Sequence, residues 1–342
     1  MAGPSARKIR EFIAPFRVEP GSKVTLPKHF DPGYKADFLT KEDGEELLQR
    51  GVELLAEYQA RLAAQDTYAV LMCLQALDAA GKDGTIRHVM SGVNPQGVEV
   101  HGFKVPSVEE LEHDYLWRYQ CKLPPRGSIG IFNRSHYEEV LVVRVHPELL
   151  ERQRLPKSAR GRDVWKRRYH EINEWERHLV DSGYKVVKIF LNLSKEEQRK
   201  RFLARIDLAD KNWKFSSADA KERGFWDDYQ KAFSEMLSNT STPWAPWYVI
   251  PADHKWFART AVSAVLVDTL MTINPQYPVI APDELAALAA TKEQLEAEAP
   301  PGAAPDPVEK AASKSAADGS AESAATEVDK AGKSRKKKSK KR

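Results

Sequence analysis

The stretch LQALDAAGKDGT at residues 74–85 decides the fold of this chain. It follows the apolar run YAVLMCL at 68–74, which is typical of a strand buried on both faces of a sheet. After it, Ile86, Val89 and Met90 recur at helical spacing. A loop between a buried strand and a helix N-terminus presents backbone N–H groups and the helix dipole to an anion. We therefore predict a phosphate-binding loop at this position.

The loop departs from the P-loop pattern G-x-x-x-x-G-K-S/T at two positions. Ala76 stands at the first glycine, and Asp83 stands where a hydroxyl normally contacts Mg²⁺. Because Asp78 and Asp83 flank Lys82, we predict that carboxylates supply the metal contacts and that Lys82 is a point charge for a phosphate oxygen. The alternative interpretation is an ordinary strand-to-helix turn whose charges are solvated.

The composition predicts one large soluble domain. The chain has 342 residues, of which 42% are hydrophobic and 30% charged, and this balance suits an α/β domain with a sizeable core. No stretch has the pattern of a signal peptide or the length of a membrane span. Two cysteines give neither a disulfide framework nor a metal-binding spacing. We expect a cytoplasmic protein without a membrane partner.

Three regions are predicted along the chain. Residues 1–40 mix basic side chains with prolines and isolated aromatics, which indicates an extended basic arm. Residues 41–285 carry the strand and helix patterns of the catalytic domain and begin with an amphipathic helix at 41–65. Residues 286–342 are rich in Ala, Glu, Lys, Ser and Pro, so we predict a disordered tail.

The end of this tail is strongly basic. Residues 333–342 carry eight basic side chains, so the rest of the chain has a net charge of about −4. Charge alone would let this end bind nucleic acid, a membrane surface or polyphosphate. The alternative is a tail that only keeps the protein soluble.

Two further apolar runs end in polar residues, as the first one does. They are SIGIFNRSHYEE at 128–139 and KVVKIFLNL at 185–193. Buried strands separated by helices predict a parallel, doubly wound sheet with its site at the carboxyl ends of the strands. We expect a loop at 91–107 over the same end of the sheet. The polar residues that should lie beside the phosphate loop are Asn133, Arg134, Glu138 and Glu139. For Arg134 the alternative is a surface ion pair.

A basic segment near the middle of the second half indicates a lid. Residues 207–224 (DLADKNWKFSSADAKERG) place cations around aromatic side chains, and a helix pattern follows. A cationic segment that closes over phosphates excludes water and completes a phosphoryl-transfer site. We predict a lid at about 207–240, and the alternative is a solvated run of charges.

Three blocks of sequence, in this order, resemble the polyphosphate kinase 2 family, whose members move phosphate between inorganic polyphosphate and nucleotides. The blocks are LDAAGKDGT at 77–85, IFNRSHYEEV at 131–140 and DKNWKFS at 210–216, and the resemblance extends over about residues 27–275. It implies a P-loop kinase-like three-layer sandwich with a central parallel sheet and a helical lid. It also implies Mg²⁺ as cofactor and a homo-oligomer, either a tetramer or a dimer.

The resemblance implies roles for individual residues. Asn133 stands where many members have a metal-binding aspartate, so Glu138 or Glu139 would have to compensate. Glu138, in place of asparagine, resembles the subgroup that accepts both nucleoside mono- and diphosphates. The predicted site comprises the catalytic residues Asp78, Lys82, Asp83 and Arg134; the polyphosphate contacts Lys82, Arg87, Arg134, Arg205, Lys211 and Lys214; the nucleotide contacts Gly81, Gly84, Asn94, Asn133 and Glu138; and the metal ligands Asp78 and Glu138.

The predicted function is reversible, Mg²⁺-dependent transfer of the terminal phosphate of inorganic polyphosphate to ADP or AMP, with GDP and GMP as further acceptors. Two other functions stay open. An ATP-dependent nucleotide kinase of the thymidylate kinase-like type would use the same fold and loop, because these alone do not select the donor. A non-catalytic polyanion-binding protein would depend on the basic tail, the one part that we expect to contact nucleic acid.

Overall fold

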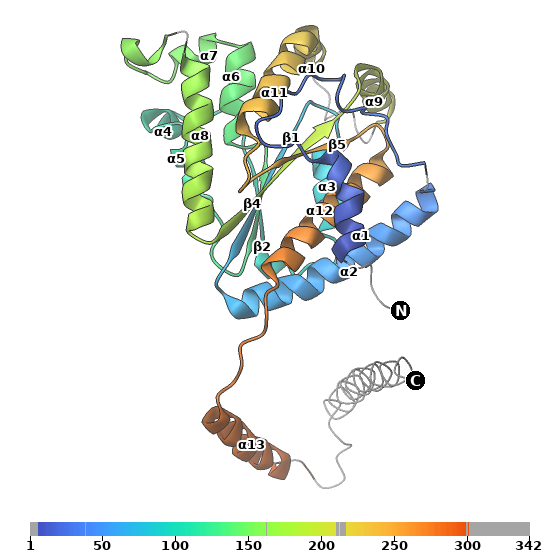
Figure 1. Cartoon of the computed structure of the whole chain (residues 1–342), viewed down its shortest axis with the longest axis vertical. Helices are drawn as coiled ribbons and strands as arrows, with labels where there is room; N and C mark the ends of the chain where they lie inside the picture. Colours follow the sequence, from blue (N-terminus) through green and yellow to red (C-terminus); the bar gives the residue numbers. More distant parts are fainter. Residues whose placement is uncertain are drawn as a thin grey trace, which may run out of the picture. The chain divides into compact units, whose positions relative to one another are not determined.

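The structure, a computed structural model, describes residues 6–37, 39–161, 163–209, 212, 217–298 and 300. Its strands are β1 (Ala69–Ala76), β2 (Val98–Gly102), β3 (Ile129–Asn133), β4 (Tyr184–Asn192) and β5 (Trp247–Pro251). Within the described residues they form one parallel sheet in the order β2-β3-β1-β4-β5 (Figure 1). The predicted doubly wound sheet is confirmed. Because strands are added on both sides of β1, the order reverses there and a crevice opens outside its carboxyl end.

Strand β1 is buried on both faces, as its uninterrupted apolar sequence predicts. All eight of its residues are buried. Alternate side chains enter different clusters of the core: Met72 and Leu74 pack in one, and Leu71 and Cys73 pack in another. The central strand thus holds its carboxyl end in a fixed place between two packed layers.

Helices cover both faces of the sheet, which gives the predicted three-layer sandwich (Figure 1). One face carries α1 (Ala6–Ile13), α2 (Lys41–Gln65), α3 (Lys82–Val89) and α12 (Lys255–Ile273), and the other carries α8 (Val164–Asp181) and α11 (Trp226–Thr240). The first unit also contains α4 (Val108–Glu112), α5 (Trp117–Gln120), α6 (Val142–Val145), α7 (Glu148–Glu151), α9 (Lys195–Asp207) and α10 (Ser217–Glu222). Single 3-10 turns include η2 (Pro95–Gly97), η3 (His136–Val140) and η6 (Arg223–Phe225).

Helix α12 is long and apolar enough to cross a membrane by length and composition. In the fold it is a core helix, because Val262, Leu266 and Leu270 are almost completely buried in the same cluster as the side chains of β1. Its apolar surface is therefore used inside the domain.

The N-terminal arm is not extended throughout, so this prediction is wrong for its first part. Ala6–Ile13 form α1, and Ile9, Ile13 and Phe16 recur at helical spacing and are buried in the core. The prediction gave weight to the prolines and cations and overlooked this spacing. The arm then follows β5, where Val18 N–H donates to Trp247 O (2.8 Å), and so covers a sheet edge that would otherwise be exposed.

The C-terminal region also differs from the prediction of disorder from residue 286. The first compact unit ends at Pro278, and the second, which begins at Val279, contains the helix α13 (Pro282–Ala297). Pro282 at the first helical turn and a run of Ala, Leu, Glu and Lys favour this helix locally. The prediction considered only burial, and α13 indeed buries none of its residues. Residues 301–342, including the basic end, lie outside the described residues.

Candidate active site

The loop between β1 and α3 contains two residues in the left-handed region of backbone conformation. Ala79 has φ 65° and Gly81, the N-cap of α3, has φ 103°. Gly81 adopts its angle without steric cost. Ala79 does not, because a left-handed residue with a Cβ costs about 1–2 kcal/mol. Contacts from neighbouring elements must therefore hold this turn in place.

Helix α9 supplies those contacts, and sequence reasoning missed them. Gln198 Nε2 donates to the carbonyl of residue 78, and Arg201 Nη1 donates to the carbonyls of residues 79 and 80, at 2.9–3.1 Å. Arg201 Nη2 reaches the carbonyls of residues 252 and 253 after β5. With Ala80 C=O held toward α9, the N–H of Gly81 must lie on the opposite side of the planar peptide. A signal was present: Gln198, Arg201 and Phe202 share the buried face of an amphipathic helix.

Lys82 lies at the start of α3 and turns back toward the strand. Its Nζ donates to Ala76 O (2.8 Å), at the position where the pattern has its first glycine. Burial and the positive charge of Arg134 lower the pKa of Lys82 to about 8. Lys82 is therefore charged at neutral pH. A bound anion would stabilise this charge, which burial and Arg134 oppose.

Arg134 joins the two segments that were predicted to meet. It has φ 64°, its N–H donates to Leu74 O (3.1 Å), and its guanidinium contacts Asp78 Oδ1 (2.7 Å) and Glu138 Oε2 (3.4 Å). The nearby Glu138 and Asp78 carboxylates raise the pKa of Arg134 against the effect of burial. The ion pair lies in a cleft and not on the open surface. The lining of this cleft includes Asp78, Arg134, Glu138, Glu222, Arg223, Trp226, Tyr229 and Phe233.

The structure separates the two glutamates that sequence reasoning left as alternatives. Glu138 lines the cleft, and burial raises the pKa of its carboxyl group. In the orientation that satisfies both ends of the Gln75 amide, its nitrogen donates to Glu138 Oε1 (2.9 Å). Glu139 instead turns to the interior, where it pairs with the buried Arg168 and accepts from Gln153 Nε2 (2.7 Å). Only Glu138 of the two faces the predicted site.

Asn133 contacts the phosphate loop directly. Its Nδ2 donates to Asp83 Oδ1 (2.8 Å). An aspartate at position 133 would place a second carboxylate against Asp83. The amide of Asn133 is uncharged, so no cation is needed to balance it. Asp83 and Asn133 thus form a hydrogen-bonded pair beside the cleft.

The carboxylates of Asp78 and Glu138 fit a magnesium ion that is shared with a substrate. The guanidinium of Arg134 contacts both carboxylates, so they lie close together, and each is partly accessible from the cleft. Mg²⁺ is usually held by one or two carboxylates together with substrate phosphates and water. Within the described residues, no group of three or more His, Cys, Asp or Glu side chains could hold a metal alone. The donor set therefore suits an ion whose other ligands come from phosphates.

Of the predicted site residues that the structure describes, Asp78, Arg134 and Glu138 line the cleft, and the others do not. Asn94 was expected over the carboxyl end of the sheet, but it caps η2 before β2 begins, and Val98 is paired with Ile129 at the start of β3. Asn94 therefore lies at the opposite end of the sheet, because α3 carries the chain back across the sheet. Arg205 packs over the Phe202 ring, at 5.7 Å from its centroid. Arg87 is exposed on α3, and Lys211 and Lys214 lie outside the described residues.

The loop at the end of the central strand and the cations gathered around it define the class of this protein: it is an α/β phosphotransferase of the P-loop kind. Its family follows from comparison with known proteins. The model of the polyphosphate kinase 2 family matches residues 38–278, and the chain belongs to this family. The resemblance seen in the three sequence blocks is confirmed.

Individual relatives agree with this assignment. The chain is 50% identical to an ADP-polyphosphate phosphotransferase of Rhodopseudomonas palustris, over 82% of this chain and 97% of that protein. It is 45% identical to an AMP/ADP-polyphosphate phosphotransferase of Meiothermus ruber, over 77% of this chain and 94% of that protein. The crystal structure of polyphosphate kinase 2 from Arthrobacter aurescens TC1 matches with a TM-score of 0.75 and 38% identity, over 86% of this chain and 100% of that chain.

Proposed function

We propose that this enzyme transfers the terminal phosphate of inorganic polyphosphate to ADP and to AMP, reversibly and with Mg²⁺. The observation that carries the proposal is the convergence of Lys82 and Arg134 on the end of β1, beside two accessible carboxylates. The relatives named for polyphosphate and ADP or AMP support the choice of donor and acceptor. The soluble domain and the family resemblance support a cytoplasmic homo-oligomer, a dimer or a tetramer.

The mechanism requires positioning and charge and little covalent chemistry. An acceptor phosphate oxygen attacks the terminal phosphorus of the polymer in line, and the shortened polymer leaves. Lys82 and Arg134 neutralise the oxygens whose charge grows in the transition state. Mg²⁺, held by Asp78 and Glu138 with phosphate oxygens, would add further neutralising charge when bound. Gln198 and Arg201 keep the loop in its shape throughout, because they bind its carbonyls.

The cleft also suits the acceptor nucleoside. Trp226, Tyr229 and Phe233 of α11 line the cleft together with Asp78 and Arg134. Aromatic and apolar walls with a few polar groups are typical of small-molecule sites. We therefore place the purine against α11 and its phosphate toward Arg134.

One assay tests the proposal against both other functions. Purified protein is incubated with Mg²⁺ and either long-chain polyphosphate or ATP as donor, separately with AMP, ADP, GMP and GDP, and the nucleotide products are resolved. Product formation with polyphosphate supports the proposal. ADP formed from AMP with ATP alone would make the enzyme an ATP-dependent kinase. A chain lacking residues 286–342 should keep its turnover. A binding protein that depends on the basic tail would instead lose its function.

Glu138→Asn is expected to depress the AMP reaction much more than the ADP reaction. AMP brings one phosphate, so the protein must supply metal ligands that the second phosphate of ADP would provide, and an amide is a weaker ligand than a carboxylate. Measuring kcat/KM for both acceptors across a Mg²⁺ series checks this, with the AMP reaction shifted to higher Mg²⁺. An equal fall for both acceptors would make Glu138 a general metal or structural residue.

The pH dependence should follow Lys82. Its pKa is lowered to about 8, so its charge is complete below that value and is lost as the pH rises through it. Because kcat/KM reports the free enzyme, kcat/KM for polyphosphate should fall through about pH 8. Lys82→Arg, whose guanidinium stays protonated, should remove this decline while lowering the plateau. A decline that persists unchanged in Lys82→Arg would assign it to another group.

A further inference from the structure

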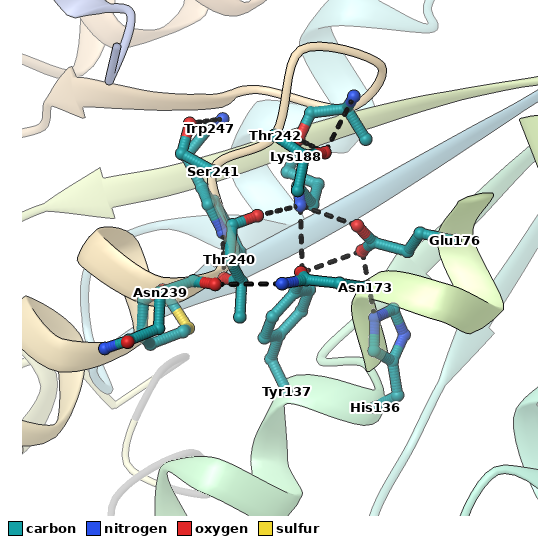
Figure 2. Close-up of polar contacts among 12 residues, drawn as sticks. His136, Tyr137, Asn173, Glu176, Lys188, Asn239, Thr240, Ser241, Thr242 and Trp247 are labelled. Carbon is teal, nitrogen blue, oxygen red and sulfur yellow. Dashed lines mark hydrogen bonds and ion pairs between the residues drawn. The ribbon is translucent and has the colours of Figure 1, made fainter. Parts of the chain in front are cut away.

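A cluster of polar side chains lies fully buried and includes Tyr137, the neighbour in sequence of Glu138 in the cleft. Lys188 of β4, Glu176 of α8, and His136 and Tyr137 of η3 each have an exposed fraction of 0%. Figure 2 shows that these side chains point toward one another and toward the backbone at Thr240. A buried charge pair is costly to desolvate, and well-packed apolar side chains of similar volume often stabilise a fold as well or better. Stability alone therefore gives little reason for this arrangement.

The hydrogen bonds of the cluster are directional and complete at its centre. The three protons of the Lys188 ammonium go to Glu176 Oε2 (2.6 Å), Tyr137 Oη (3.0 Å) and Thr240 O (2.5 Å). Glu176 Oε1 accepts from Tyr137 Oη (2.7 Å) and pairs with His136 Nε2 (3.2 Å). The ion pair and its hydrogen bonds thus link four elements: β4, α8, η3 and the end of α11.

Two of those elements, η3 and α11, also contribute residues to the lining of the cleft. Tyr137 directly precedes Glu138 on η3, and Glu138 faces Arg134. Thr240 is the last residue of α11, whose N-terminal half carries the aromatic side chains of the cleft. The carbonyls at the end of a helix have no partner within it, and here the Lys188 ammonium binds one of them. The pair therefore connects η3, which carries Glu138, to α11, which carries the aromatic side chains.

We propose that Lys188 and Glu176 are positioning residues for phosphoryl transfer, which hold Glu138 and α11 in register so that both face the same acceptor. This inference rests on the proposed function. An apolar replacement would fill the same space, but it would fix neither the Tyr137 hydroxyl nor the Thr240 carbonyl. Loss of the pair should then misplace η3 and α11 without unfolding the domain.

The test is the double variant Lys188→Met/Glu176→Leu, which leaves no charge stranded in the core. We expect a folded protein with a moderately lower melting temperature, because the Tyr137 hydroxyl and the Thr240 carbonyl lose these partners, and a kcat for AMP lowered by about 10–100-fold, since displacements near 1 Å have effects of this size. The KM for polyphosphate should change little, because Lys82 is untouched. Full turnover in the folded double variant would overturn the inference.

A double-mutant cycle separates positioning from a purely structural role. If the pair acts through Glu138, its effect on the AMP-to-ADP ratio of kcat/KM should largely disappear when Glu138→Asn is already present. Additive effects would overturn the inference. Tyr137→Phe, which removes only the hydroxyl that links η3 to the pair, gives the same cycle if the double variant does not fold.

The control is Asn173→Ala. Asn173 lies on α8 like Glu176, and its Nδ2 donates to Asn239 O (2.9 Å), next to the carbonyl that Lys188 binds, but among the described residues no hydrogen bond joins it to η3. Its removal should leave the acceptor ratio unchanged. A wild type without any polyphosphate-dependent activity would instead contradict the proposed function, so the two failures are distinguishable.

Discussion

Lys82→Ala should lower kcat by about 10²–10³-fold, the usual effect of removing one preorganised charge contact. The ammonium donates to a carbonyl at the end of β1, in surroundings that already oppose its charge. A developing phosphoryl charge nearby would therefore gain strongly from it. Thermal stability should stay close to that of the wild type, because the side chain is not packed in an apolar cluster. Steady-state kinetics at saturating substrates and a thermal melt measure both quantities.

Lys41→Ala is the matched control for this variant. Lys41 is an exposed lysine at the start of α2, with a side chain 62% exposed in an ion pair with Glu45. Exposed pairs of this kind contribute little. Removing Lys41 lowers the net charge by the same amount as Lys82→Ala does. Because Lys41 is not a predicted site residue, kcat should not change. A similar loss of turnover in both variants would point to net charge, and unchanged turnover in Lys82→Ala would exclude Lys82 from the site.

Arg134→Ala is expected to lower kcat by a similar factor of about 10²–10³. Its guanidinium contacts Asp78 and Glu138 at once, so removal loses a phosphate contact and also leaves two carboxylates without their shared cation. The residue is left-handed with φ 64°, and alanine carries the same backbone penalty as arginine, so stability should change little.

Arg134→Lys distinguishes the charge from the geometry. Lysine keeps the positive charge but cannot present two parallel donors in a fixed plane. It should recover only part of the lost activity, with the remaining defect in kcat. Complete recovery would mean that charge alone is required, and a wild-type kcat in Arg134→Ala would remove Arg134 from the mechanism.

The local patterns predicted the elements of the site that follow directly from chain order. A buried strand, a glycine loop and a helix made the phosphate loop at 74–85 recognisable, and the second apolar run placed Arg134 and Glu138 at the same sheet edge. These predictions depend on the periodicity of side chains and on the geometry of parallel strands, which are both local. The family resemblance then identified the chemistry of the donor.

Some predictions failed because they required the direction of the chain in space, and others because they relied on composition. Asn94 is only a few residues beyond α3, yet the helix carries it to the far end of the sheet. The extended arm and the disordered tail were inferred from composition. The structure has α1 in the first part of the arm and α13 up to Ala297, because helical spacing favours α1 and helix propensity favours α13. Disorder over residues 301–342 remains a prediction. The lid lysines at 211 and 214 remain predictions.

By itself, the sequence determined the parallel sheet, the phosphate loop and the identity of the cations that meet there. Only the tertiary structure decided which of two adjacent glutamates faces the cleft, because Glu139 pairs with Arg168 of α8 and Glu138 with Arg134. It also decided that Arg201 shapes the loop and that Lys188 joins η3 to α11. The physical reason is that these contacts link residues distant in sequence, and the partners of a buried charge are set by packing that no local pattern records.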